Sequence, residues 1–525
     1  MPINFIPNDP LAVQDLPVRK IKPRANRKTG RAGFSFEQTF KEGQYALDTE
    51  EFLYWQCREA ALWALETWEA IEGKLDQWAE TVDGRKKLPV VHIIGGEINA
   101  GYTGSRLEFV VHNTETRMTM TGASADVVVH ETGHALLDSI RPDLFETNFT
   151  ETGAFHEAFA DCMSLLTALS DKLTRTKLLK ATPDLGQPNF VEALMEDMSD
   201  GRKRVNGAQD PASEPRRALN NLTWQLPTTL PPSGPPSVLT REVHSFARIF
   251  VGCFYDVIRN IFNSLPKQNQ TSLQQAAEAA GRILITAARQ APATARFFSS
   301  VGKAMVLADQ TLNQGAHRQA INDAFNGHGL QLGSSAMLAP EASLEGEAPR
   351  LAGGGGRILS PATHNDLRSR IGAARNARLL VNALNIGGED VAEVINRREI
   401  SLDKVSNRLR GVVLMAREPV LVGASGMRAA VLSTLPEPTV TTDEVHAFVE
   451  SLLDNNQIAL GAGGGAGGAV MPRLAGRTRS LAALSPESPE PGLPTHGVKV
   501  IGGKMVLKRL RYTCGHAFRA GLTRR

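Results

Sequence analysis

One short motif constrains this chain more than any other feature. It is HETGH at residues 130–134. Residues four apart lie on one face of a helix, so His130 and His134 can offer two imidazoles to one ion. Glu131 lies beside them and can hold a metal-bound water as a general base. The pattern therefore predicts a zinc site built for hydrolysis.

A second apolar segment supplies the rest of the predicted site. A catalytic zinc needs three protein ligands and one open position. The segment GAFHEAFAD at residues 153–161 has the character of a helix and offers Glu157 as the third ligand. Asp161 follows at i+4 on the same face, where it can accept a hydrogen bond from the free ring N–H of a ligating histidine. Apolar residues on both sides of HETGH favour a buried helix over a surface helix with incidental charges.

These two segments resemble those of the thermolysin-like gluzincin metallopeptidases. The run DVVVHETGH at residues 126–134 matches that family's D-V-x-x-H-E-x-x-H, and residues 153–161 match its G-A-x-N-E-x-x-x-D. His156 departs from the pattern, because the family has Asn at that position. The resemblance covers about residues 40–330. It implies endopeptidase activity.

The resemblance also assigns roles to the motif residues. It implies zinc bound by His130, His134 and Glu157, with Glu131 as the base. It gives His244 the role of the histidine that donates to the developing oxyanion, a contribution of roughly 3 kcal/mol to lowering the barrier.

Two partners in the predicted site stay open. The family orients its oxyanion histidine with an Asp, whereas Glu242 is the only acid close to His244 here. The family also has an arginine that orients the zinc-binding glutamate and the substrate carbonyl. Arg216 or Arg217 can take that role, and the sequence does not choose between them.

Substrate contacts are implied on the other side of the motif. Family members hold extended substrate backbone on an edge strand that carries an Asn-Ala pair, which Asn99 and Ala100 match. A plain turn is the alternative at this place. The family often has a Tyr between the two zinc helices, but residues 143–152 contain none. The second oxyanion donor is therefore unassigned.

Composition bounds the class of protein. The chain has 525 residues, of which 42% are hydrophobic, and a net charge of +3, so no global field favours nucleic acid. Four scattered cysteines are expected to be buried thiols. Neither a signal peptide nor an apolar run long enough to span a membrane is recognisable. We expect a cytoplasmic protein without membrane association, with export lacking a cleaved signal left open.

The order of composition along the chain predicts six regions. These are a disordered basic arm (1–33), a thermolysin-like zinc peptidase domain (34–330), a linker (331–357), a small helical domain (358–455), a Gly/Pro/Ser-rich linker (456–497), and a β-hairpin with a basic tail (498–525).

The predicted fold class is α+β. A mixed sheet with helices, followed by a helical subdomain, would enclose a cleft of the zincin type, with a flexibly linked and mainly helical C-terminal region. The predicted function is zinc-dependent hydrolysis of peptide bonds in extended polypeptides. The alternatives are an inactive, zinc-stabilised binding protein and an adaptor that binds a protein partner through its C-terminal region.

Overall fold

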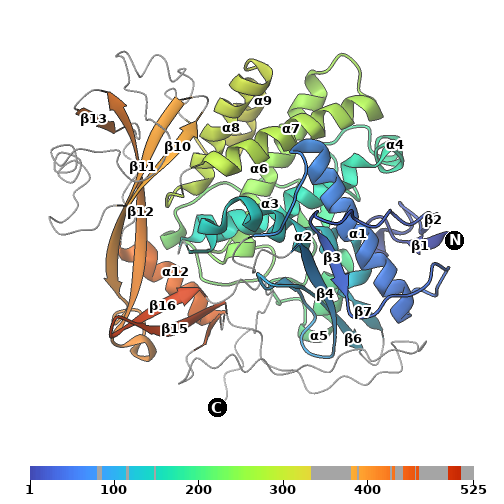
Figure 1. The fold of residues 1–525 in the computed structure, drawn as a ribbon, viewed down its shortest axis with the longest axis horizontal. Helices are drawn as coiled ribbons and strands as arrows, with labels where there is room; N and C mark the ends of the chain where they lie inside the picture. The colour runs from blue at the N-terminus through green and yellow to red at the C-terminus, as the bar shows by residue number, and fades with distance from the viewer. Residues whose placement is uncertain are drawn as a thin grey trace.

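The computed structural model describes most of the chain as two units (Figure 1). The N-terminal unit comprises the described residues up to 332, and the C-terminal unit comprises those from 380 to 509. The described ranges are 1–79, 86–113, 117–146, 149–291, 293–332, 380–386, 389–425, 428–431, 442–455, 457–459 and 495–509. Both helices and sheets are present, which confirms the α+β class.

The front of the N-terminal unit is a five-stranded mixed sheet. Its order is β3-β4-β6-β5, and β7 also pairs with β6. β3, β4 and β6 run parallel, whereas β5 and β7 run antiparallel to β6. The strands are β3 (Gly33–Phe36), β4 (Lys87–Ile94), β5 (Ala100–Tyr102), β6 (Leu107–Asn113) and β7 (Met118–Met120).

Helices build the rest of this unit around one continuous apolar core. The core includes residues from Phe5 to Leu332, so the sheet and the helices fold together. Apolar residues at helical spacing bury one face of most of these helices. The helices are α1 (Glu50–Ile71), α2 (Ala125–Ile140), α3 (Thr150–Ser170), α4 (Lys172–Ala181), α5 (Glu196–Asn206), α6 (Val243–Ser264), α7 (Gln270–Gln290), α8 (Phe297–Asn313) and α9 (Arg318–Gly327).

Short elements connect these helices. β8 and β9 form a small antiparallel pair behind the zinc motif. Among the described residues, four 3-10 turns lie between the longer elements of this unit. The short elements are β8 (Ala193–Leu194), β9 (Arg216–Arg217), η1 (Pro10–Ala12), η3 (Thr121–Ala123), η4 (Pro142–Glu146) and η5 (Pro227–Thr229).

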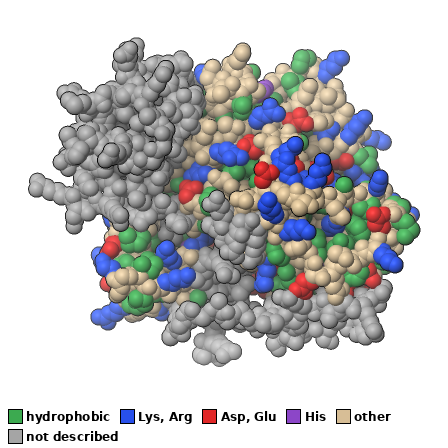
Figure 2. Space-filling view, viewed as in Figure 1, with side chains coloured by type: hydrophobic (Ala, Val, Ile, Leu, Met, Phe, Trp, Pro, Cys, Tyr) green, Lys and Arg blue, Asp and Glu red, His purple; other side chains and the backbone are tan. Residues whose placement is uncertain are grey.

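The prediction of a disordered basic arm at residues 1–33 is wrong. β1 (Ile3–Phe5) pairs with β2 (Arg19–Ile21), and the Ile3 and Phe5 side chains are buried. The basic residues lie against acids of helix α1 and its C-terminal flank, where Arg24 pairs with Glu59 and Glu66, Arg27 with Glu69, and Arg31 with Asp76. Basic and acidic side chains are likewise interspersed over the face shown in Figure 2.

The C-terminal unit is built mainly of strands, so the predicted small helical domain at 358–455 is also wrong. Its sheet has the order β10-β11-β12-β16-β15-β14, with β13 on β12. Residues 389–395, which lie inside that predicted helical domain, belong to β11. The elements are β10 (Leu380–Ile386), β11 (Glu389–Ser401), β12 (Val412–Ser425), β13 (Arg428–Val431), α12 (Thr442–Asp454), β14 (Ile458–Ala459), β15 (His496–Ile501) and β16 (Lys504–Arg509), with the turn η7 (Asn407–Leu409) before β12.

The predicted C-terminal hairpin is confirmed. β15 and β16 pair antiparallel through a turn at Gly502 and Gly503, whose positive φ values of 56° and 78° suit glycine. Most of the two predicted linkers and the basic tail lie outside the described residues. Cys57, Cys162 and Cys253 are buried thiols as expected, and Cys514 lies outside the described residues. Among the described helices, none has the length and apolarity to cross a bilayer.

Helices α2 and α3, which carry the predicted metal ligands, pack closely. A Cβ on Gly133 would stand 2.9 Å from the Cα of Ala160 on α3 and 3.2 Å from the Cβ of Met163. Only glycine lets the backbones of α2 and α3 approach this far. The small residue in the middle of HETGH therefore sets the distance between the helices that carry the predicted ligands.

We expect Gly133→Ala to destabilise the protein by roughly 1–3 kcal/mol, because the added methyl group overpacks the α2–α3 contact. Zinc retention after dialysis should fall as well. Thermal unfolding and metal analysis measure both effects. Gly327→Ala is the matched control, because its Cβ would meet nothing within 4 Å. Equal melting temperatures for the two variants would contradict the close packing.

Candidate metal centre

Three buried side chains converge between α2 and α3. His130 and His134 come from successive turns of α2, and Glu157 comes from α3. The two histidine Nε2 atoms lie 3.0 Å apart, and Glu157 Oε2 lies 3.4 Å and 3.6 Å from them. Donor atoms on a tetrahedral zinc, with bonds of about 2.0–2.2 Å, stand roughly 3.3–3.5 Å apart. The three predicted ligands are therefore brought together at a spacing that suits a metal ion.

The first histidine is held by a carboxylate and an arginine. His130 Nδ1 lies 2.8 Å from Asp161 Oδ1, which also accepts a hydrogen bond of 2.6 Å from Arg216 Nη2. With Nε2 on a metal, Nδ1 keeps its proton and donates to Asp161. Arg217 points elsewhere and pairs with Glu192. Of the two arginines, Arg216 is therefore the one that contacts the ligand network, through Asp161 and His130.

Burial and neighbouring charges have opposite effects on the pKa values of His130 and Asp161. Burial alone would lower the pKa of His130, but Asp161 and Glu157 outweigh it and raise that pKa to about 9. Burial would raise the pKa of Asp161, yet Arg216 and His130 hold it below its usual value. Asp161 is therefore an anion that favours proton or metal cation on His130.

The second histidine is held by another histidine. His134 Nδ1 lies 2.9 Å from His156 Nδ1. Burial lowers the pKa of His134 to about 4 and that of His156 well below its usual value, so both rings are neutral. A metal on Nε2 of His134 leaves the proton on Nδ1, so His134 donates and His156 accepts. The ring of Phe145 lies 4.1 Å from the ring of His156. The departure from the family pattern at His156 thus keeps a hydrogen-bond acceptor where the family has Asn.

Glu131 is the one acid at the centre that has no hydrogen-bonding partner among the described residues. Both of its carboxylate oxygens are buried and without such a partner. Burial raises its pKa to about 8, with Glu157 adding to the rise and His130 opposing it. A buried carboxylate without a partner costs folding free energy, so its retention fits a role toward a bound group. This residue and the His/His/Glu donor set together fit a zinc ion with its water.

His244 faces the centre from the start of α6. Its Nε2 lies 3.3 Å from Glu157 Oε2, and its Nδ1 lies 2.6 Å from Glu242 Oε1. Glu242 also caps α6 by accepting hydrogen bonds from the amides of His244 and Ser245. Burial would lower the pKa of His244, but Glu157 and Glu242 raise it. Glu242 is therefore the orienting partner that the sequence left open.

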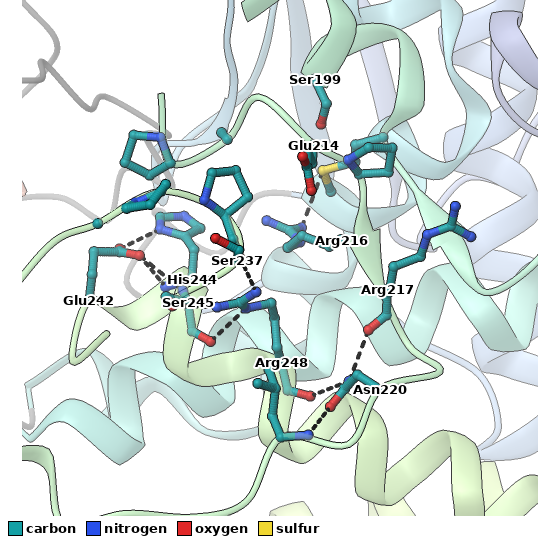
Figure 3. Close-up of a pocket in the computed structure, with 18 of the residues that line it drawn as sticks. Ser199, Glu214, Arg216, Arg217, Asn220, Ser237, Glu242, His244, Ser245 and Arg248 are labelled. Atoms are coloured by element: carbon teal, nitrogen blue, oxygen red, sulfur yellow. Dashed lines mark hydrogen bonds and ion pairs between the residues drawn. The ribbon is translucent and has the colours of Figure 1, made fainter. Parts of the chain in front are cut away.

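A cavity of about 490 Å³ opens beside His244 (Figure 3). The cavity is lined by Arg216, Glu242 and His244 on the side of the predicted metal ligands. Arg248 also lines it and donates to the backbone carbonyls of Pro236 and Val238. Residues of α5 and of the segment after β9 also line it, and they mix apolar side chains such as Met198 and Leu219 with polar ones such as Ser199 and Asn220. The cavity can hold a side chain of a molecule bound at the centre.

The predicted substrate strand lies at the edge of the sheet. Ala100 opens β5, whose one partner in the described sheet is β6. The Asn99 carbonyl accepts hydrogen bonds from the Val110 amide and the Thr121 hydroxyl. The Tyr102 hydroxyl donates to Asp138 Oδ2 at 2.7 Å, which ties β5 to α2. A substrate role for Asn99 and Ala100 stays a prediction.

Two residues of the site, His156 and Glu242, had no role assigned from the sequence. His156 lies four residues before Ala160, which meets Gly133 of α2, so helical spacing places it on the face of α3 toward α2. Glu242 could have been identified as a helix cap, since it directly precedes the first turn of the helix that carries His244.

Comparisons with known proteins add no family assignment. No model of a known protein family matches the chain, and no curated protein is found to be similar to it. The structural basis for a function is therefore the buried His130, His134 and Glu157 group, which can bind a metal ion.

Asp161→Asn should lower zinc affinity by about 10–100-fold, because it removes the charge that stabilises the ligating form of His130. Competition with a chromogenic chelator measures this loss. Asp143→Asn is the control, since the Asp143 side chain is 42% exposed and pairs with Arg141. Equal zinc affinity in both variants would contradict the role of Asp161.

Asp138 should make stability depend on pH. Burial raises its pKa from 3.8 to about 7, although Tyr102 and Arg509 oppose the rise. Between these values the folded protein holds a proton that the unfolded chain has lost, so the free energy of unfolding falls as pH rises from about 4 to about 7, by up to about 4 kcal/mol.

Asp138→Asn keeps an acceptor for Tyr102 and removes this dependence. Relative to wild type, the variant should gain stability between pH 5 and pH 8 in urea unfolding. Asp76→Asn is the control, because Asp76 is 72% exposed. If the free energy of unfolding of Asp138→Asn differed from that of wild type by the same amount at pH 5 and at pH 8, the pH dependence assigned to Asp138 would be refuted.

Proposed function

We propose that the chain is a zinc-dependent endopeptidase of the thermolysin-like type, acting on extended polypeptides. The observation that carries this proposal is Glu131, a buried carboxylate without a hydrogen-bonding partner among the described residues, beside three metal-binding side chains. A purely structural metal site has no need of such a carboxylate. The mixed sheet followed by helices supports a zincin-type domain over about residues 34–330.

Each residue of the centre then has a task. His130, His134 and Glu157 would hold zinc, which supplies a polarised carbonyl and an activated water when bound. Glu131 accepts the proton of that water and passes it to the leaving nitrogen. A pKa near neutrality makes Glu131 able both to take and to release the proton.

His244 and the cavity serve the substrate. His244 Nε2 faces the centre and donates a hydrogen bond to the oxyanion, while Glu242 fixes its ring from the other side. The cavity beside His244 receives the side chain that follows the cleaved bond. The β5 edge at Asn99 and Ala100 can add the substrate backbone as a further strand.

Casein cleavage by wild type and by Glu131→Gln tests the proposal, with zinc measured in both. We expect about one zinc in each protein. Cleavage should fall by at least about 10³-fold in the variant, because the proton acceptor is lost and the ligands remain. Glu196→Gln is a matched control, since burial also raises the pKa of that acid, to about 7, outside the centre.

The other outcomes separate the alternatives. Zinc in both proteins with cleavage by neither would favour a zinc-stabilised binding protein. Absence of zinc from both would overturn the proposed site altogether.

A further inference from the structure

The C-terminal unit shares a core with the helix starts that flank the metal centre. Its apolar cluster, which includes Leu402, Leu414 and Phe448, also contains Phe149 of the N-terminal unit. Phe149 stands at the N-cap position of α3, eight residues before Glu157. Val243, the first residue of α6, packs against both cores. Apolar packing therefore joins the C-terminal unit to the beginnings of α3 and α6.

Polar contacts join the same unit to the segment that precedes His244. Helix α12 supplies Glu450, whose Oε2 lies 2.8 Å from Arg241 Nη2. Asn455, which directly follows α12, donates to the Pro232 carbonyl at 3.2 Å, and Ser451 donates to the same atom at 3.3 Å. Arg241 directly precedes Glu242. The segment 230–242 is thus held on its outer side by α12, while its inner side lines the cavity.

A further contact reaches the other side of the centre. Arg509, the last residue of β16, lies over the ring of Phe145 at 5.4 Å. The Phe145 ring packs against the ring of His156 at a tilt of 36°, and His156 is hydrogen-bonded to His134. The C-terminal unit therefore also contacts the surroundings of the metal centre through β16.

The segment 230–242 has little structure of its own. Four of its residues are prolines, which have no backbone N–H, and its internal backbone bonds include Arg241 to Pro231 and Val238 to Pro235. Contacts from outside the segment therefore help to decide where it rests, as when Arg248 of α6 donates to the carbonyls of Pro236 and Val238. The contacts of α12 are of that kind.

We propose that the C-terminal unit is a built-in positioning partner of the centre: through Glu450, Ser451 and Asn455 it holds segment 230–242, and through that segment it places Glu242 and His244. The proposal rests on the proposed function for its effect on catalysis, and on geometry alone for its effect on the segment. Deleting the unit would expose its shared core at Phe149 and Val243, so side-chain variants in the full chain are the suitable test.

The triple variant Glu444→Gln, Glu450→Gln, Asn455→Ala tests the proposal. Glu444 is included because it pairs with Arg296 at 2.6 Å across the same interface. We expect faster hydrogen–deuterium exchange over residues 230–246, unchanged zinc content, and a kcat for casein-derived peptides reduced about tenfold or more, with KM changed less. A second triple variant, with Glu450→Asp instead of Glu450→Gln, should recover part of kcat, because the negative charge at this position is present again.

Glu399→Gln is the matched control. Glu399 pairs with Lys504 within the C-terminal sheet at 2.7 Å and lies on its exposed side. This control should leave both exchange and kcat as in wild type. A purely structural interface would instead lower the melting temperature of the triple variant and leave kcat unchanged at low temperature, which would overturn the proposal.

The readouts distinguish two kinds of failure. Unchanged exchange over residues 230–246 in the triple variant would overturn the positioning role whatever the activity. Faster exchange in a protein whose wild type cleaves no peptide would support the positioning of the segment and reject the peptidase function.

Discussion

The contact between α2 and α3 at Gly133 is the constraint on which the site depends. Because α2 approaches α3 closely there, His130 and His134 meet Glu157 from the neighbouring helix. The same contact brings Asp161 against His130. Burying several charged groups is costly unless each is paired, and nearly all of them are. Glu131 stands apart as the carboxylate left for a bound group, so the packing that assembles the ligands also creates the chemistry.

Much of the centre could be predicted from the sequence because it is encoded locally. His130 and His134 are one helical turn apart, and so are Glu157 and Asp161, so periodicity alone placed them in pairs. The choice between Arg216 and Arg217 was different. Adjacent residues of a strand point to opposite faces, and the pairing of β9 with β8 decides which face meets Asp161. Only the tertiary structure contains that information.

The two wrong predictions share a physical origin in long-range partners. Residues 1–33 are rich in basic and proline residues, and their order comes from acids of α1 that are distant in sequence, such as Glu59 and Glu69. Residues 389–395 space Val391, Val394 and Ile395 as a helix would. Their β-branched side chains favour a strand, and pairing with β12 settles the outcome. Neither the amino-acid composition nor the local spacing of apolar residues contains information about partners that are distant in sequence.

The shared core at Phe149 has a consequence for how the protein is made. The predicted metal ligands end at Glu157, whereas Glu450 and Asn455 enter the chain about 300 residues later. At ordinary rates of synthesis that interval lasts roughly 15–60 s. During this time a nascent chain has its metal-binding residues but lacks the helix that holds segment 230–242. On the proposed role of α12, the surroundings of His244 reach their final arrangement only after that helix has been made.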